Sequence, residues 1–546
     1  MVSLEINKAN FLQEYLVFME QYLIYNSLSY PILTVIVAVP LFGSLITLFI
    51  KGDRYLKIWG LMVTLITAVL SLPLYSNFDL TTAKYQFAEF RDWIPFVNID
   101  YVLGVDGISV LLVLLTTLVM PLCILCSWSY IQERFKEFIC VLLLMEASMV
   151  GVFVSLNFVL FFIFWEAMLV PMYLIIAVWG GPRKDYASIK FFLYTLIGSI
   201  FLFVAIIVMY VTTGTFFIPE LMAHHYSFSY QAWIFWAFTF AFAIKIPMWP
   251  LHTWLPAAHV EAPTAGSVIL ASILLKMGGY GFLRFCLPMA PAATMYFMPY
   301  LIAISVISII FGSYLALGQS DVKRLIAYSS VGHMGFVTLG IFLLNDVGIK
   351  GAILQMVNHG ITTGALFILV GIIYERTHSR EISDNSALGM MMPIYVTFLV
   401  IFSLSSLGFP GTNSFVGEFL VLLASFYKYK IVGGLAVIGA ILAAAYMLRL
   451  VQKMVWADSD GHMHHGDKSH LFDLNFREIV TLAFLTVFVF WIGLNPEPFL
   501  KVMDTSTTHL LKQVEIGRSL LPAGHGEHHA LLNGVGESIK HILALK

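Results

Sequence analysis

Charged residues are scarce in this sequence. Lysine, arginine, aspartate and glutamate make up 11% of the 546 residues, whereas soluble globular domains carry about 25%. Hydrophobic types make up 59%, and the mean hydropathy is +0.86. A soluble protein of this length would form two or more domains with polar surfaces. The scarcity of charge therefore excludes a soluble protein, and the net charge of −2 gives no sign of a nucleic-acid partner.

Cysteine is also rare, with four in the chain, so no disulfide framework is expected. Cys123 and Cys126 form a CxxC pair inside an apolar segment that has no second pair, so packing is favoured over metal or redox chemistry. The sequence lacks a glycine-rich nucleotide fingerprint and cluster-binding cysteines. We therefore expect no redox centre and no cofactor in this chain.

A cleavable signal peptide is not evident. The first 30 residues lack its compact basic and apolar regions and carry Glu5, Lys8, Glu14 and Glu20. We expect the chain to insert into the membrane through its own helices.

Apolar segments long enough to cross a bilayer recur along the chain. A span needs about 20 mostly apolar residues, and the sequence predicts an all-α polytopic membrane protein with about fourteen spans. Their ranges are 31–50, 56–75, 107–129, 137–156, 158–179, 189–212, 231–258, 264–287, 297–317, 323–344, 350–374, 391–427, 432–455 and 476–495. Residues 8–28 are expected to form a further interfacial or spanning helix.

Basic residues gather in alternate loops. With fourteen spans, one side of the membrane holds Lys51, Arg54, Lys57, Arg134, Lys136, Arg183, Lys184, Lys190, Lys323, Arg324, Arg376, Arg380, Arg449, Lys453, Lys468 and Arg477. The other side holds Lys84, Arg91, Lys350, Lys428 and Lys430. The positive-inside rule places the first side in the cytoplasm. Both termini are then predicted on the outer, periplasmic side of a bacterial inner membrane.

Two predicted spans, 231–258 and 391–427, are interrupted at prolines, by IPMWP at 246–250 and LGFPGT at 407–412. Proline removes a helix donor, and freed backbone at membrane depth is tolerated only where protein or a water-filled cavity covers it. The breaks lie five spans apart, so the units around them have opposite topology. We predict two inverted five-helix repeats, spans 4–8 and 9–13, rather than two kinked helices.

This pattern predicts five regions along the chain. They are three N-terminal spans (1–130), the first repeat (131–290), the second repeat (291–456), a histidine-rich cytoplasmic loop (457–475), and the last span with the C-terminal tail (476–546).

Ionisable residues lie inside the predicted spans, where a charge costs roughly 2.5–3.5 kcal/mol on insertion scales. Such residues usually face the bundle interior and have a partner. They are Glu146, Glu166, Lys245, Lys276, His333, His359 and Glu418, on seven different spans, with His252 just beyond the first break. Arg284, near the end of its span, is expected to extend to the membrane surface instead.

A simpler interpretation is that these groups only hold helices together, and a lone buried histidine often does no more than bind a carbonyl. Seven titratable groups on seven spans, two of them beside helix breaks, favour a proton relay. Burial favours a neutral lysine and a nearby carboxylate favours a charged one. Movement of Glu166 away from Lys245 would therefore release a proton to the next acceptor. Glu146 is the weakest candidate among the carboxylates.

Five segments carry a resemblance to a known family. They read FFIFWEAMLVPMYLIIAVWGG, AFAIKIPMWPLHTWLPAAHVEAPTAGSVILASILLKMGGYGFLRF, DVKRLIAYSSVGHMGF, QMVNHGITTGALFILVGIIYER and GFPGTNSFVGEF, within residues 160–420. The chain resembles the antiporter-like membrane subunits of respiratory complex I (NADH-quinone oxidoreductase), of the subunit M or mitochondrial chain 4 type. The wording WEAMLVPMY and the lack of a very long C-terminal lateral helix indicate this type.

The resemblance implies roles for the buried groups. Glu166 resembles the fifth-helix carboxylate that modulates Lys245 on the broken helix, Lys276 the lysine that passes protons on, and Glu418 the acid that takes them outward. The histidines of the polar axis match His252, His333 and His359. One departure is Ala257, where the family usually has an aspartate. The resemblance also implies that NADH, FMN, Fe–S clusters and quinone belong to other subunits, and that neighbouring membrane-arm subunits are partners.

The sequence-based hypothesis is a proton-translocating subunit of an NADH:quinone oxidoreductase. Lys245 would load a proton from the cytoplasm and pass it through Lys276 and the histidines to Glu418. The alternatives are a D-type subunit of a multisubunit Na⁺/H⁺ antiporter, a membrane subunit of an energy-converting hydrogenase, and an inactive scaffold. An intact set of ionisable groups argues against the scaffold.

A loop rich in histidine forms a separate candidate. It contains His462, His464, His465 and His470 among three aspartates and could bind a metal. A solvated loop is the favoured interpretation.

Overall fold

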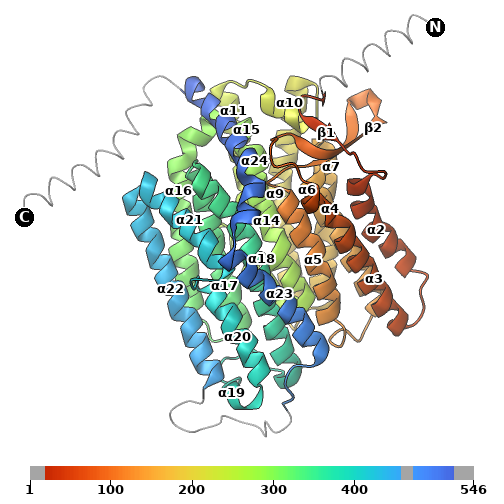
Figure 1. The fold of residues 1–546 in the computed structure, drawn as a ribbon, viewed down its shortest axis with the longest axis vertical. Coiled ribbons are helices and arrows are strands. Elements are labelled where there is room, and N and C mark those ends of the chain that lie inside the picture. The colour runs from red at the N-terminus through yellow and green to blue at the C-terminus, as the bar shows by residue number, and fades with distance from the viewer. Residues whose placement is uncertain (1–18, 457–470, 522–546) are drawn as a thin grey trace, which may run out of the picture.

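The computed structural model describes residues 19–456 and 471–521, which form a bundle of long helices with a few strands at one end (Figure 1). Ten helices in this part of the chain are long and apolar enough to cross a membrane, and three shorter helices are also apolar. The polytopic, helical fold class predicted from the sequence is confirmed. The ten long helices do not by themselves establish fourteen crossings.

The elements up to the first break cover the amino-terminal half of the chain. In order they are β1 (Leu23–Tyr25), α2 (Ile32–Thr47), α3 (Asp53–Ser71), α4 (Pro73–Ser76), β2 (Tyr85–Ile94), the 3₁₀ turn η1 (Pro95–Val97), β3 (Ile99–Val105), α5 (Val110–Cys126), α6 (Phe135–Val154), α7 (Phe158–Ala167), α8 (Leu169–Trp179), α9 (Lys184–Thr213), α10 (Ile218–Ala223) and α11 (Phe228–Lys245).

The elements after that break include a long helix, Thr264–Met289, that contains two π-helical segments. In order they are α12 (Trp254–Glu261), α13 (Thr264–Ile269), the π segment η2 (Leu270–Leu274), α14 (Leu275–Gly281), the π segment η3 (Phe282–Cys286), α15 (Leu287–Met289), α16 (Pro291–Leu317), α17 (Val322–Phe342), α18 (Asp346–Thr377), α19 (Leu388–Met391), α20 (Pro393–Ser406), α21 (Asn413–Lys428), α22 (Lys430–Val455), α23 (Phe476–Leu494), α24 (Glu497–Ile516) and the 3₁₀ turn η5 (Gly517–Leu520).

A small sheet at one end of the bundle was not predicted from the sequence. β2 pairs antiparallel with β3 and parallel with β1. The helix expected over residues 8–28 is wrong where the structure describes it, because Leu23–Tyr25 is a strand, and residues 1–18 lie outside the described part. The strands β2 and β3 lie in a predicted loop, where hydropathy gives no signal for a hairpin.

Both predicted helix breaks are present. α11 ends at Lys245 and α12 begins at Trp254, whereas α20 ends at Ser406 and α21 begins at Asn413. The two breaks close in the same way, because in each a backbone N–H donates to the carbonyl five residues earlier. These bonds join Met248 to Ala243 at 2.8 Å and Phe409 to Leu404 at 3.0 Å. The shared geometry agrees with the predicted pair of repeats, whose exact division of the chain stays a prediction.

The loops predicted to be basic meet at one end of the bundle, which we call the basic end. Hydrogen bonds tie successive loops together there. They join Lys136 to the Leu48 carbonyl at 3.1 Å, Trp179 to the Glu133 carbonyl at 3.0 Å, Arg477 to the Ser129 hydroxyl at 2.9 Å, Arg380 to the Val260 carbonyl at 2.5 Å, and Arg449 to the Leu317 carbonyl at 2.7 Å. The alternation of loops read from the sequence is therefore present in the fold.

The other end, which we call the opposite end, carries the sheet, α10 and α24 (Figure 1). Lys84 donates to the Glu20 carbonyl there at 2.7 Å, and Lys350 pairs with Asp504 of α24 at 2.6 Å. The expectation that Arg284 extends to the membrane surface is wrong. Its side chain is 6% exposed because Asp106, from the turn before α5, supplies a counter-charge at 2.5 Å.

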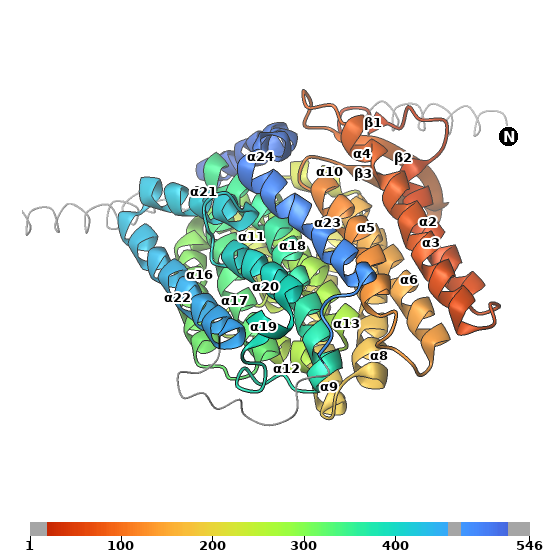
Figure 2. The same ribbon diagram turned by 60° about the horizontal axis from the view of Figure 1, so that its bottom comes forward.

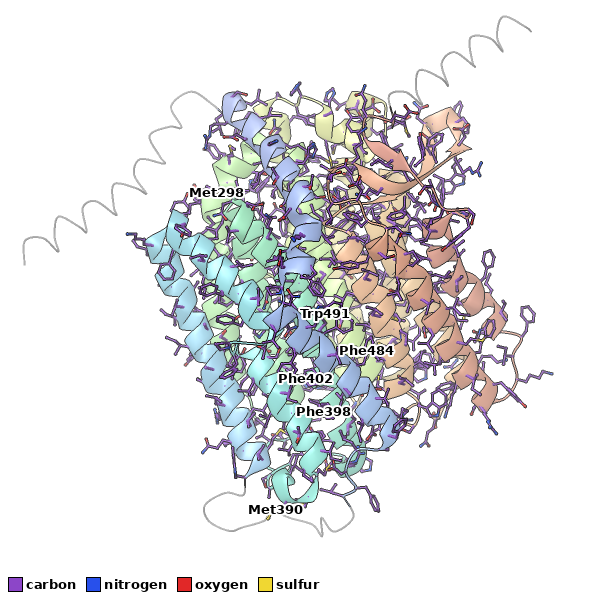
Figure 3. All side chains as sticks on the ribbon, viewed as in Figure 1. Met298, Met390, Phe398, Phe402, Phe484 and Trp491 are labelled. Carbon is purple, nitrogen blue, oxygen red and sulfur yellow. The ribbon has the colours of Figure 1, made fainter. Side chains whose placement is uncertain are left out.

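Three of the titratable groups, Lys276, His333 and His359, lie on the most buried of the long helices. The most apolar stretches of α18 and of the α13–α15 helix are entirely buried, and that of α17 is 94% buried. Figures 1 and 2 both place α2 and α3 at one flank of the bundle and α22 at the other. Large apolar side chains cover the outside, including Phe484 and Trp491 of α23, which are 36% and 44% exposed (Figure 3).

Candidate functional site

A row of titratable side chains begins at Lys276 of α14. Its ammonium nitrogen Nζ lies 2.6 Å from Nδ1 of His359 on α18 and also contacts the Ala271 carbonyl in the π segment η2. Lys276 is fully buried and His359 is 1% exposed. The lysine therefore has one titratable neighbour at hydrogen-bond distance, well away from solvent.

The row continues from His359 to His333 of α17 and then to Glu418 of α21. The two imidazole centroids lie 5.7 Å apart, and Nδ1 of His333 lies 2.7 Å from Oε1 of Glu418. Gln355 also donates to that carboxylate oxygen, at 2.9 Å. We call Lys276, His359, His333 and Glu418 the central row. The sequence predicted all four residues, and the fold brings them into this order.

Hydroxyl groups and amides surround the far end of the central row. Ser406 and Tyr446 place their hydroxyl oxygens 3.3 and 3.4 Å from Nε2 of His333. At the second break, Ser405 donates to the side chain of Asn413 at 2.6 Å, and Asn358 donates to the Asn413 carbonyl at 2.7 Å. These contacts supply hydrogen-bond partners to polar groups at membrane depth that the interrupted helix leaves without partners of its own.

Lys245 is the last residue of α11 and is 3% exposed. Its Nζ lies 5.0 Å from the centroid of the Trp165 ring, and Trp165 donates to the Ser199 hydroxyl at 3.1 Å. Glu166, beside Trp165, interacts electrostatically with Lys245, although their charged atoms form no ion pair within 4.0 Å. The cation therefore rests on an aromatic face with a carboxylate nearby.

Two helices approach backbone to backbone between Lys245 and Lys276. A Cβ atom added at Gly278 of α14 would lie 2.7 Å from the Ile246 amide nitrogen and 2.8 Å from the Phe242 carbonyl oxygen. Only glycine allows this approach, which sets the position of the first break against the helix that carries Lys276.

We expect Gly278→Ala to lower the thermal stability of the complex and the rate of proton uptake, because backbone atoms cannot move aside as a side chain can. Overpacking of this kind costs about 1–3 kcal/mol. Thermal unfolding of the detergent-solubilised complex would measure the effect. Gly434→Ala is the matched control, because no atom lies within 4 Å of a Cβ added there. Equal stability of the two variants would contradict the prediction.

Two predicted residues lie outside the central row. Glu146 of α6 is fully buried, and neither of its carboxylate oxygens has a hydrogen-bond partner within residues 19–456 and 471–521. His252, in the turn after the first break, is 5% exposed, and its ring centroid lies 5.9 Å from that of Phe311. His462, His464 and His465 lie outside the described residues. In the described part, no group of three or more His, Cys, Asp or Glu could hold a metal ion.

One buried histidine was missed by the sequence reasoning. His259 of α12 is fully buried and stacks on Phe367 with centroids 4.5 Å apart. Neither ring nitrogen has a partner among the described residues. It interacts electrostatically with Lys276 and with Lys323, which is 8% exposed and donates to the Ala262 carbonyl at 2.5 Å. The sequence signal that could have identified His259 is its position within a mostly apolar segment.

Proton transfer is the chemistry that this arrangement allows. Imidazole can donate at one nitrogen and accept at the other, a carboxylate accepts, and a lysine donates or accepts according to its protonation. Adjacent groups at 2.6 and 2.7 Å are within direct transfer distance. The two imidazoles would need a ring movement or a water molecule between them.

Two family descriptions match the chain. The amino terminus of NADH-ubiquinone oxidoreductase chain 4 matches residues 34–152, and the membrane part of NADH:quinone oxidoreductase/Mrp antiporter matches residues 155–443. Together they cover nearly all of the first twelve predicted spans and part of the thirteenth.

Similar proteins carry related names. The chain is 45% identical to NADH-ubiquinone oxidoreductase chain 4 of Arabidopsis thaliana over 476 residues, which is 87% of this chain and 95% of the relative. It is 44% identical to NADH-quinone oxidoreductase subunit M of Rhodobacter capsulatus over 474 residues, or 84% and 91%. A chain of respiratory complex I from Thermus thermophilus has a similar structure, with a TM-score of 0.80, 28% identity and coverage of 88% and 99%.

Proposed function

The chain belongs to the family of subunit M, or chain 4, of NADH:quinone oxidoreductase, the proton-translocating membrane subunits, and on this premise we propose that its central row carries the protons. Electrons would move in other subunits of the same complex, which would hold NADH, FMN, Fe–S clusters and quinone. The chain would take part in the enzyme reaction only through the coupled proton movement.

One observation carries this proposal, the series of four neighbouring titratable groups from Lys276 to Glu418. Lys276 contacts His359 at 2.6 Å, and His333 contacts Glu418 at 2.7 Å. The centroids of the two imidazole rings lie 5.7 Å apart. All four residues are less than 5% exposed. Ionisable groups at membrane depth are costly and usually functional, and a structural ion pair would need two such groups rather than four in line.

We propose that the basic end faces the cytoplasm, in accordance with the positive-inside rule. Lys245 would then load a proton from that side and pass it to Lys276 and His359, with which the buried His259 also interacts electrostatically. Glu418, beside the second break, would receive them at the far end of the row. Both termini would lie outside a bacterial inner membrane.

Lys245 and Glu166 would control the entry step. A lysine and a carboxylate roughly 6.5 Å apart at an effective dielectric of about 20 attract each other by about 2.5 kcal/mol. Glu166 forms no direct ion pair with Lys245 and is instead held by a hydrogen bond with Ser199. Displacement of Glu166 would remove that attraction and favour transfer of the Lys245 proton toward Lys276.

The interpretation as an NADH:quinone oxidoreductase subunit is favoured over the two transporter alternatives. The fold alone does not separate these candidates, because a chain of an Mrp complex from Dietzia sp. has a similar fold, with a TM-score of 0.77 at 21% identity. The match of residues 34–152 to the amino terminus of chain 4, and identities of 44–45% along nearly the whole length of the relatives, favour the first. Its partners would be the other membrane-arm subunits, especially neighbouring antiporter-like subunits.

His359→Leu tests the proposed function, because it interrupts the central row between Lys276 and His333. We expect NADH-driven proton uptake by membrane vesicles to fall at least tenfold, with the complex still assembled on native gels. His378→Asn is the control, because His378 caps the end of the same helix in the left-handed region that asparagine tolerates. Parental proton uptake by an assembled His359→Leu complex would overturn the proposal.

A further inference from the structure

A cavity of about 480 Å³ opens at the opposite end of the bundle, between the sheet, α10, α15 and α24. Exposed residues at its mouth include Lys84, His224 and His225, and buried residues at its floor include Asp106 and Arg284. These elements gather at the top of the view in Figure 1. The cavity is roomy and polar enough to hold several water molecules.

An unsatisfied group supports the presence of water. The hydroxyl of Tyr226 lines this cavity and is buried without a hydrogen-bond partner among the described residues. Buried polar groups nearly always find a partner, and ordered water supplies it where protein does not. Water would therefore reach from the mouth of the cavity to its floor.

The floor is a buried ion pair that is held from several sides. Arg284 contacts Asp106 at 2.5 Å and donates to the hydroxyls of Tyr85 at 2.8 Å and Tyr280 at 3.3 Å. Asp106 also accepts the backbone N–H groups of Ile108 and Ser109, both at 3.1 Å. The guanidinium is thus fixed in place, and the carboxylate is occupied by donors.

This floor lies close to the central row along a single helix. Lys276 and Tyr280 are four residues apart in α14 and so share one face, and Arg284 of the π segment η3 contacts the Tyr280 hydroxyl. At 1.5 Å per residue, Arg284 lies about 12 Å from Lys276 along the helix axis. The Tyr280 hydroxyl bridges part of that distance and donates to the Phe153 carbonyl at 3.4 Å.

Water held 12 Å from a relay lysine would offer protons a short path that avoids Glu418. A guanidinium in a protein does not give up its proton, and a fixed arginine excludes protons and cations from membrane pores. We propose that Arg284, held by Asp106, is an electrostatic seal between this cavity and Lys276, so that protons leave through Glu418. This inference rests on the proposed function of the central row.

The test measures passive proton entry into vesicles that carry the assembled complex, without NADH and with the cavity side acidified. Arg284→Gln combined with Asp106→Asn removes both charges while keeping similar shapes, which avoids an unpaired buried charge. We expect proton entry to rise at least threefold in this variant. Arg376→Gln with Glu478→Gln is the control, because it removes an ion pair of 2.7 Å at the basic end, and proton entry should stay at the parental rate.

Single substitutions separate the charge from the packing. Arg284→Lys and Asp106→Asn both keep a positive charge on the floor of the cavity. Both variants should therefore show the parental rate of passive proton entry. Adding Lys276→Met to the Arg284→Gln/Asp106→Asn variant should return proton entry to the parental rate, because the leaking protons would pass through Lys276. A parental leak rate in the assembled double variant, a leak in Asp106→Asn, or a leak that survives Lys276→Met would each overturn the seal.

The leak test does not depend on active transport. Failure of the seal would appear as unchanged passive proton entry, whereas failure of the proposed function would appear as unchanged NADH-driven uptake in His359→Leu. A double variant that loses NADH-driven uptake without a leak would place the ion pair on the outlet itself and would also overturn the seal.

Discussion

Lys245→Ala is expected to abolish NADH-driven proton uptake, with a loss of at least tenfold, in a complex that still assembles. Lys245 is a buried cation that faces the Trp165 ring at 5.0 Å and interacts with Glu166 at the first helix break. Alanine removes the ammonium group that would load the proton. It also removes the electrostatic interaction through which Glu166 would control that proton. Because proton movement would be coupled to electron transfer, we expect NADH oxidation to fall with it.

The measurement compares quenching of a pH-sensitive dye in vesicles with the rate of NADH oxidation. Lys428→Ala is the matched control, since Lys428 donates to the Leu343 carbonyl at 2.6 Å at the opposite end and lies outside the central row. Glu166→Ala should resemble Lys245→Ala. If Lys245→Ala retained parental uptake, the lysine would serve only to hold helices together, and an NADH-independent sodium/proton exchange assay would be the next experiment.

Glu418→Gln is expected to have an effect of similar size at the far end of the row. The carboxylate contacts His333 at 2.7 Å and Gln355 at 2.9 Å, and an amide of the same shape can keep hydrogen bonds there but cannot take up the arriving proton. We expect NADH-driven proton uptake to fall at least tenfold. The thermal stability of the complex should fall only slightly.

The control for this substitution is Glu497→Gln, at the exposed start of α24, where the carboxylate pairs with Lys501 in solvent. Exposed pairs of this kind contribute about 0–1 kcal/mol, so parental activity is expected. A Glu418→Gln complex with parental uptake would show that protons leave the central row by another group. Loss of assembly instead would indicate a structural role, which the amide was chosen to preserve.

Several features of this protein followed from its sequence alone. A bilayer requires long apolar helices because backbone groups cannot remain unpaired in lipid, so hydropathy located the long apolar helices but not α24, which follows the last predicted span. Proline chemistry located both breaks for a similar reason, and the cost of charge in lipid identified Lys245, Lys276, His333, His359 and Glu418 as candidates. All of these are local properties of the chain.

The tertiary structure decided which of these groups meet. Lys276 and His359 are 83 residues apart in the sequence, His333 and Glu418 are 85 apart, and Arg284 and Asp106 are 178 apart. Helices that are apolar all round carry little signal for which face turns inward, so neither the order of the central row nor the burial of Arg284 could be read from periodicity. The sheet and His259 were missed for a related reason, because hydropathy describes depth in the membrane and not the neighbours of a side chain. Those neighbours depend on helix packing, which only the folded chain fixes.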